Sequence, residues 1–425
     1  MRPHFACFSR TALASVAVAI ASAGALAACG GSGGSASGGG SSSGPITIGA
    51  SLSLTGDFSA DGQAFDRGYK LWASDVDAHG GIDGRQVKLT VLNDASNPNQ
   101  AVTNYQTLIS TDHVDLTFGP FSSLITTPAE AVAARAGYAF IEGAGGAPTV
   151  FDAPPNQADH NVFDVSLPIA DEMVPFVNWI KSLPPARRPK TAAYPMAQDP
   201  FADPPVQHAQ EELRKLGVKT VYSKVFPEEV ADYKAPADQV AASGAQLVVL
   251  GSTDVPTVGA FMQAFEQQHY TPKMFIAAAG PDQGQSFTSA VGAANANGVM
   301  VPNGWYPGYP NAASKKMVSQ YVAKYGGGAS GVNADVAEAY AVGQVAAQAI
   351  TATGGTDNAK IISYLHGGHP ISTVQGPVRF DDLGENGSAA SFIFQWQKNG
   401  SYDQVLPPGA PGSVPILAAK PAWSS

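Results

Sequence analysis

The clearest chemical signal in this sequence is a pair of serines where a predicted strand passes into a predicted helix. The segment runs Gly119, Pro120, Phe121, Ser122, Ser123. A glycine turn at the start of a helix exposes backbone N–H groups, and with a serine hydroxyl these groups can hold a carboxylate. The alternative is that Ser122 or Ser123 only caps the helix, and spacing alone favours that alternative.

Two other loops that follow predicted strands could also contact a ligand. Asp57 to Asp61 form the first, and Glu142 to Gly146 form a glycine-rich one. A carboxylate at Asp61 could meet an ammonium, amide or hydroxyl group. Alternatively it is an acid at a helix N-terminus, a position that the helix dipole favours. The glycine-rich loop could present backbone carbonyl groups, or it could be a plain turn.

Aromatic residues mark two more candidate positions. Phe201 follows a predicted strand in the second half of the chain, and Trp305 and Tyr306 follow a later one. Aromatic side chains often line clefts, where they supply apolar surface. Packing in a core is the alternative for all three.

The elements that must position these residues alternate between strand and helix. Short β-rich runs begin at Ile46, and the stretch that follows has helical spacing through Phe65, Tyr69, Trp72 and Val76. The alternation pauses at the proline-rich segment 183–189 and then resumes. Repeated βα units indicate an α/β fold whose parallel sheets carry helices on both faces. Two such series predict two Rossmann-like lobes with a cleft between them.

The N-terminal residues carry the signals of export. Arg2 and Arg10 give the first ten residues a positive charge, and the apolar run Thr11–Ala23 follows them. The residues from Leu26 to Cys29 are Leu-Ala-Ala-Cys. This resembles the lipobox of bacterial lipoproteins, whose cysteine is lipidated. We predict a signal peptide over residues 1–28, and a lipidated Cys29 with a flexible Gly/Ser linker over 29–44. An ordinary secretory signal peptide with a chance cysteine is the alternative.

Composition excludes several classes of function. The 425 residues have a formal net charge of -10, and no basic stripe is present, which argues against a nucleic-acid partner. Cys7 and Cys29 are the only cysteines, so the folded body has no disulfide, cysteine nucleophile or cysteine-based metal site. The motifs of hydrolases, phosphate-binding loops and zinc proteases are absent. We therefore expect neither an enzyme nor a bound metal or cofactor.

Several motifs, taken in order, carry a family likeness. They span Ile46–Gly56, Gly62–Gly81, Asn93–Pro98, Gly119–Ser123 and Ala339–Gln344. Their order and spacing resemble those of the leucine/branched-chain amino acid-binding family of transporter receptors, with the type I periplasmic-binding fold. The likeness covers residues 46 to 402.

The resemblance implies a domain organisation. Three hinge crossings are expected near Val165, Pro302 and Gly376. The N-terminal lobe would then comprise residues 45–165 with 303–375, and the C-terminal lobe 166–302 with 376–406. Residues 407–425, rich in Pro, Gly and Ala, are expected to form a flexible tail.

The resemblance also implies roles for particular residues. Ser123 matches the serine that holds the ligand carboxylate, and Asp282 matches the acid that meets the amino group, with Ala278–Gly280 competing for that place. Gly146 stands where leucine-binding members have a threonine. Asp61 and Thr253 stand where those members have an aromatic residue. The predicted ligand-binding set is Asp61, Ser122, Ser123, Ala144, Gly146, Phe201, Thr253, Asp282 and Trp305.

These inferences predict an extracytoplasmic solute-binding lipoprotein of an ABC importer. It would be a monomer, anchored to the bacterial cell membrane by lipid, and would deliver its ligand to an ABC permease. The carboxylate end of the site resembles that of the family and the ammonium end differs, so the expected ligand is an amino acid or a related small carboxylate. The alternative is a ligand-sensing receptor module with the same fold.

Overall fold

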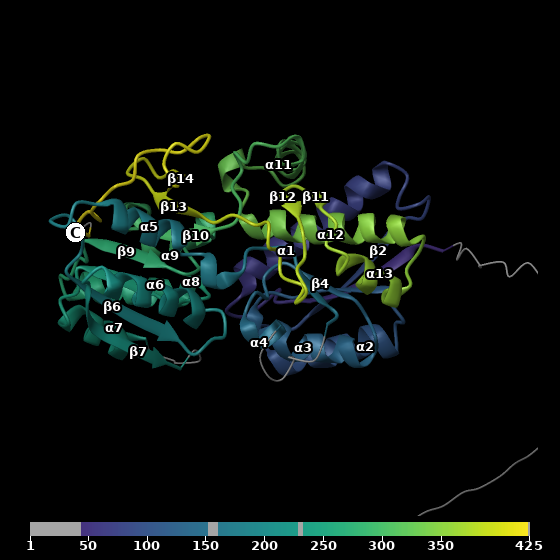
Figure 1. Cartoon of the computed structure of the whole chain (residues 1–425), viewed down its shortest axis with the longest axis horizontal. Coiled ribbons are helices and arrows are strands. Elements are labelled where there is room, and N and C mark those ends of the chain that lie inside the picture. The colour runs from purple at the N-terminus through teal and green to yellow at the C-terminus, as the bar shows by residue number, and fades with distance from the viewer. Residues whose placement is uncertain (1–43, 152–159, 228–232, 424–425) are drawn as a thin grey trace, which may run out of the picture. The chain divides into compact units, whose positions relative to one another are not determined.

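The computed structural model describes residues 44–151, 160–227 and 233–423. The predicted signal peptide and the predicted lipidation site at Cys29 lie outside these ranges. Within them the chain forms two lobes, each built on its own sheet (Figure 1).

The sheet of the first lobe is parallel throughout, with strand order β2-β1-β3-β4-β5. β1 lies in its interior and pairs with both β2 and β3. Because all five strands run the same way, their carboxyl ends meet at one edge. The strands are β1 (Ile46–Leu52), β2 (Val87–Asn93), β3 (Leu116–Phe118), β4 (Phe140–Glu142) and β5 (Val162–Asp164).

Helices cover both faces of this sheet, as Figure 1 shows. The long helices α1 and α12 pack on one face with the buried Trp72. The other face carries α2 and α3, with Tyr105 and Phe140 in the core between them and the sheet. The helices of this lobe are α1 (Ser59–Ala78), α2 (Pro98–Ser110), α3 (Ser123–Arg135), α4 (Pro148–Phe151), α11 (Ala312–Tyr325), α12 (Ala334–Thr353) and α13 (Asn358–Leu365).

The second sheet has the order β14-β13-β10-β9-β8-β6-β7. In it β13 pairs in the antiparallel sense with both β10 and β14, and the remaining pairs are parallel. Its strands are β6 (Thr191–Ala197), β7 (Lys219–Phe226), β8 (Leu247–Leu250), β9 (Met274–Ala277), β10 (Val299–Asn303), β13 (Phe392–Trp396) and β14 (Tyr402–Leu406). Its helices are α5 (Val174–Ser182), α6 (Asp203–Lys215), α7 (Lys234–Ala242), α8 (Val255–Gln267), α9 (Gly284–Val291) and α10 (Ala293–Ala296). Separate apolar clusters lie on its two faces.

The chain passes between the lobes three times. It leaves the first sheet after β5, returns after β10, and leaves again after a small hairpin of β11 (Ile371–Thr373) and β12 (Gly376–Val378). The predicted α/β class with two Rossmann-like lobes is therefore confirmed.

The C-terminal residues differ from the predicted flexible tail. Lys420 is buried and donates from Nζ to the carbonyl oxygen of Asn295 at 3.0 Å. Trp423 Nε1 donates to the carbonyl oxygen of Tyr270 at 2.7 Å. The prediction rested on the Pro, Gly and Ala content of this segment and took no account of these two side chains. Their hydrogen bonds hold the segment against the second lobe.

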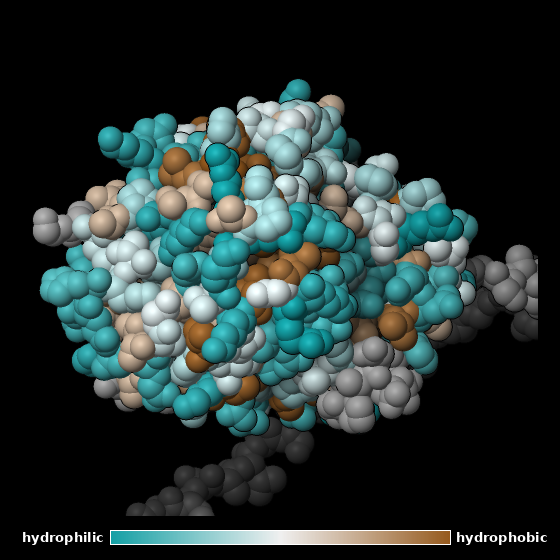
Figure 2. All heavy atoms as spheres, turned by 60° about the vertical axis from the view of Figure 1, so that its left-hand side comes forward, coloured by the Kyte–Doolittle hydropathy of each residue, from teal (hydrophilic) through white to brown (hydrophobic). Residues whose placement is uncertain are grey.

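Figure 2 shows one face of the molecule, on which hydrophilic residues surround smaller hydrophobic areas. Val225 and Tyr325 are the large hydrophobic residues that remain exposed in the described part of the chain. No helix in the described ranges has the length and apolar character that crossing a bilayer requires.

Close packing between α1 and α12 depends on two glycines. A Cβ atom at Gly68 would lie 2.6 Å from the Cβ of Ala339, and one at Gly343 would overlap the indole of Trp72. These contacts let the two helix backbones approach closely, which fixes α12 over the sheet.

We predict that Gly343→Ala lowers the free energy of unfolding by about 1–3 kcal/mol, because the added methyl group displaces the buried Trp72. Gly259→Ala in α8 is the matched control. Its Cβ would meet its nearest neighbours at 3.8 and 4.0 Å, so we expect a neutral effect or a gain of up to about 1 kcal/mol. Urea denaturation measures both, and equal effects would contradict the packing argument.

Candidate functional site

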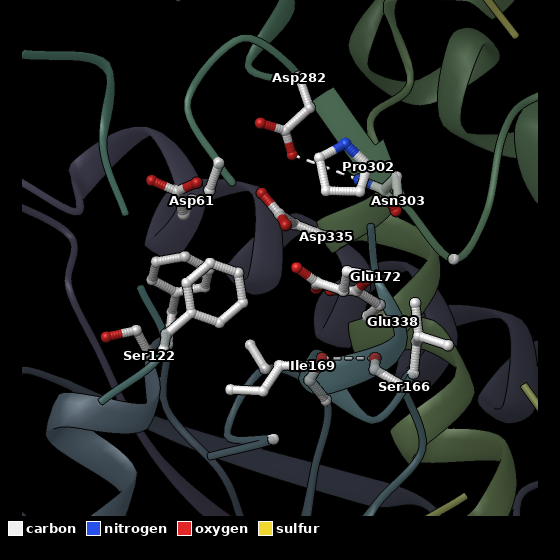
Figure 3. Close-up of a pocket in the computed structure, with 18 of the residues that line it drawn as sticks. Asp61, Ser122, Ser166, Ile169, Glu172, Asp282, Pro302, Asn303, Asp335 and Glu338 are labelled. Carbon is white, nitrogen blue, oxygen red and sulfur yellow. Dashed lines mark hydrogen bonds between the residues drawn. The ribbon is translucent and has the colours of Figure 1, made fainter. Parts of the chain in front are cut away.

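A pocket lies between the two lobes at the ends of strands from both sheets (Figure 3). It is lined from the first lobe by residues of α1 and α12 and of the segments after β3, β4 and β5. The second lobe contributes residues that follow β6, β9 and β10. The centres of water molecules can occupy about 60 Å³ of it.

The structure brings six of the nine predicted ligand-binding residues to this pocket. They are Asp61, Ser122, Ala144, Gly146, Phe201 and Asp282. Thr253 is buried and does not line it. Trp305 is also buried away from the lining, and its indole Nε1 donates to the Ser314 hydroxyl at 3.1 Å.

The two serines at the start of α3 differ in what they can offer a ligand. Ser123 Oγ accepts a hydrogen bond from the backbone N–H of Ala147 at 3.2 Å, and the residue does not line the pocket. Ser122 is the N-cap of α3, but its side chain makes no capping hydrogen bond. It is 2% exposed, and its hydroxyl has no partner. Ser122 therefore replaces Ser123 as the hydroxyl available to a ligand.

The loop after β4 is held rigidly beside the pocket. The backbone N–H groups of Ala144 and Gly145 donate to Glu142 Oε2 at 2.7 and 2.6 Å. A Cβ at Gly146 would lie 2.9 Å from Ile169 and 3.1 Å from Asp164 Oδ2. The threonine expected at this position in leucine-binding members would thus require its neighbours to shift.

The most distinctive property of the pocket is its acidity. None of its lining residues is Lys, Arg or His. Six of them are acids, namely Asp61, Asp164, Glu172, Asp282, Asp335 and Glu338. Figure 3 shows the carboxyl groups of five of these, the labelled ones, turned toward the same space.

Sequence reasoning identified Asp61 and Asp282 and missed the other four acids. Asp335 and Glu338 had a usable signal, because they are the only charged residues in the 20-residue helix α12. Residues three apart share a helix face, so both can reach the pocket. Asp164 is the last residue of β5, and its place at a strand end could have marked it as a candidate. Nothing in the sequence around Glu172 indicated that it would reach the pocket.

Several of these carboxyl groups have hydrogen-bond partners that fix their orientation. Asp282 Oδ1 accepts from the N–H of Gly280 at 3.0 Å, and its Oδ2 accepts from Asn303 Nδ2 at 3.3 Å. Asp164 Oδ1 accepts from the N–H of Ser166 at 2.7 Å. By contrast, Asp61 Oδ2 and Glu172 Oε2 are buried without a partner.

One hydrogen-bonded group joins the lobes beside the pocket. Gln283, which precedes α9 in the second lobe, donates from Nε2 to Asp335 Oδ2 at 2.8 Å. Asn333, the N-cap of α12 in the first lobe, donates to the same oxygen at 3.1 Å and to Gln283 Oε1 at 3.0 Å. The arrangement of the lobes is therefore linked to an acid of the pocket.

Burial raises the pKa values of these acids. The main cause is the loss of water around each carboxyl group, and neighbouring carboxyl groups add to it for every acid of the set except Asp282. The pKa of Asp335 rises to about 8, that of Asp164 to about 7 and that of Asp282 to about 6. The pKa values of Asp61, Glu172 and Glu338 are raised for the same reasons. Without a cationic partner the pocket therefore retains protons at neutral pH.

These shifts predict a pH dependence of stability. In the unfolded chain Asp335 loses its proton near its ordinary pKa of 3.8, whereas the folded protein keeps it up to about pH 8. Between these values the folded state binds more protons, so its stability falls as the pH rises. We expect Asp335→Asn to flatten this fall and to raise the free energy of unfolding at pH 8 by about 1–3 kcal/mol.

Chemical denaturation without ligand at pH 5, 6.5 and 8 tests this expectation. Asp382→Asn serves as the control, because Asp382 is exposed and lies away from the pocket. A variant at Asp335 that is less stable than the parent chain at pH 8 would contradict the assigned cause.

Comparisons with known proteins agree with this architecture. A family model described as periplasmic binding protein matches residues 45–401. An amino acid binding protein of Pseudomonas aeruginosa is 27% identical over 367 residues, covering 85% of this chain and 92% of the relative. Leu/Ile/Val-binding protein homolog 3 of Brucella melitensis is 24% identical, covering 83% of this chain and 91% of the relative.

Solved structures share the fold at low sequence identity. The branched-chain amino acid transporter substrate binding protein LivJ of Streptococcus pneumoniae, in complex with isoleucine, has a TM-score of 0.70 and 19% identity, covering 85% of this chain and 99% of its own. The leucine binding protein LivK of Thermotoga maritima has a TM-score of 0.73 and 18% identity, covering 84% and 97%. The match of the family model over most of the chain shows that this protein belongs to the periplasmic binding protein family, of the leucine/isoleucine/valine-binding type.

Proposed function

We propose that this protein is the extracytoplasmic solute-binding component of an ABC importer and binds an amino acid or a related small solute between its lobes. The observation that carries this proposal is the acidic pocket formed by strand-end segments of both sheets, with buried oxygen atoms that lack partners. Buried polar groups without partners are costly, and a ligand that supplies hydrogen bonds removes that cost.

The two ends of an amino acid find complementary groups in the pocket. The ammonium group can donate to acids such as Asp282 and Asp61. The carboxylate can accept from the Ser122 hydroxyl at the N-terminus of α3, where the helix dipole favours negative charge. Names of relatives add support, since they include an amino acid binding protein and a substrate binding protein in complex with isoleucine.

The expected mechanism is closure of the lobes around the solute. Residues of both lobes line the pocket, so a bound solute contacts both at once and favours the closed arrangement. The contact between Gln283 and Asp335 would then hold the closed form, which docks on a permease. The family supports the role in import through its transporter-associated members.

We also propose that the mature protein is held at the bacterial membrane by a lipid on Cys29. The Leu-Ala-Ala-Cys sequence and the Gly/Ser-rich stretch after it support this proposal. A lipid anchor would keep the binding lobes close to the permease while the linker lets them move.

A bulky side chain in the pocket should block binding. Ala144 lines the pocket and is half-buried, so Ala144→Trp fills the space that the solute needs. A solute at 100 times its Kd stabilises the parent protein by about 2.7 kcal/mol, which a thermal-shift screen of amino acids detects. We expect Ala144→Trp to remove this stabilisation, whereas Ala352→Trp at the exposed end of α12 should retain it. Failure of every amino acid and small amine to stabilise the parent protein would refute the proposed function.

Replacement of the predicted lipidation site should release the protein from the membrane. We expect Cys29→Ser to move the protein from the membrane fraction to the soluble fraction of the producing cell, because serine cannot form the thioether with diacylglycerol. Cys7→Ser, within the predicted signal peptide, should leave the fractionation unchanged. Membrane retention of the Cys29→Ser protein would reject the anchor.

A further inference from the structure

We propose that the solute carries at least two cationic nitrogen groups on a short aliphatic chain, as in a small diamino acid. This inference rests on the proposed function and concerns the chemical class of the solute. A pocket for a leucine-like side chain needs one acid for the ammonium group and apolar walls elsewhere. Six acids and no basic residue line this pocket instead.

The acids are distributed over more of the pocket than one ammonium group can contact. Asp61, Asp282 and Asp335 lie together at one end in Figure 3, and Glu172 and Glu338 lie beyond them. They come from different elements of both lobes, so no single turn or helix accounts for their meeting. An ammonium group has three donors, and two such groups match this spread of acceptors better than one.

Unpaired buried oxygen atoms show where donors are missing. Asp61 is 1% exposed, and its Oδ2 has no hydrogen-bond partner. Glu172 Oε2 is also buried without a partner. No Lys, Arg or His lies within 4.0 Å of any of the six acids among the ion pairs of the described ranges. A cationic solute can supply these donors.

A metal ion does not fit this set of acids. In the described part of the chain, no three acidic, histidine or cysteine side chains converge closely enough to hold one. Cations such as Ca²⁺ need several oxygen ligands at about 2.3–2.6 Å from one centre. Carboxyl groups spread along a pocket suit an extended organic cation instead.

Apolar residues between the acids support a short aliphatic chain. Phe121, Ile169, Leu167 and Pro302 line the same pocket. Methylene groups between two ammonium groups would pack on these side chains and be removed from water.

Isothermal titration calorimetry with matched solutes tests the inference. L-Lysine and L-norleucine have the same chain length and differ in the second ammonium group, and L-ornithine shortens the chain by one methylene. We expect lysine or ornithine to bind at least about tenfold more tightly than norleucine, because charge-assisted hydrogen bonds to buried carboxylates are strong. Equal or tighter binding of norleucine or leucine would overturn the inference and leave the proposed function intact. If no amino acid or amine binds, the proposed function itself fails.

Cadaverine, which has both ammonium groups and no carboxylate, shows which groups the pocket recognises. Binding of cadaverine as tight as that of lysine supports the inference and removes the role of Ser122 in holding a carboxylate. If cadaverine binds more weakly than lysine and lysine is still preferred over norleucine, the result supports both the second cationic group and the role of Ser122 in holding a carboxylate.

Charge-neutralising variants assign the second ammonium group. We expect Glu338→Gln to reduce the preference for lysine over norleucine by about tenfold, with little change in norleucine affinity. Glu172→Gln provides a second variant if Glu338→Gln does not fold, and Asp382→Asn at an exposed site is the matched control. An unchanged preference in both folded pocket variants would overturn the inference.

Proton release provides a readout that needs no variant. The groups that face the solute are Asp61 of α1, Asp164 of β5, Glu172 before α5, Asp282 before α9, and Asp335 and Glu338 of α12. Their raised pKa values mean that a dication must displace protons near neutral pH. We expect lysine to release more protons at pH 6.5 than norleucine, as calorimetry in two buffers of different ionisation enthalpy measures. Equal release would count against a second cationic group.

Discussion

The structure depends on one electrostatic constraint, which is the burial of several carboxyl groups in one place without a cation from the chain. Burial raises the pKa values of Asp61, Asp282 and Asp335, and the charge of Asp282 raises those of Asp61 and Asp335 further. Removing such groups from water is unfavourable unless they are protonated or paired. Protons can meet this constraint, as the raised pKa values of the acids indicate, and a cationic solute can meet it with ammonium groups. The buried carboxyl groups that lower the stability of the folded chain are therefore the same groups that can bind a cationic solute.

The scaffold around the pocket explains how this constraint is tolerated. Parallel strands bring their carboxyl ends to one edge of each sheet, and the pocket lies where segments from both edges face each other. Helix α12 supplies two of the acids and is fixed over the first sheet by the glycine contacts at Gly68 and Gly343. Gln283 then joins α12 to the second lobe through Asp335. The acid that links the lobes therefore also lines the pocket.

The likeness to the relatives concerns the fold, whereas the acidity of the pocket concerns its lining residues. The comparisons with known proteins show the family and the fold. The acids of α12 and the glycine at position 146 are features of this chain's own pocket. Function resides in such sites and not in the fold that presents them, so the solute has to be inferred from the lining residues.

The sequence by itself determined the α/β class, the two series of strand and helix, and the glycine–serine turn before α3, because these follow from local periodicity and turn chemistry. It also pointed to Asp61, Ser122, Ala144, Gly146, Phe201 and Asp282, which follow strands and reach the pocket. Only the tertiary structure decided that Ser122 and not Ser123 presents its hydroxyl, that Trp305 is buried, and that Lys420 and Trp423 anchor the C-terminal segment. It alone brought Asp164 and Glu172 together with Asp335 and Glu338, since these two pairs lie far apart in the chain and meet only when two sheets pack with their strand ends facing.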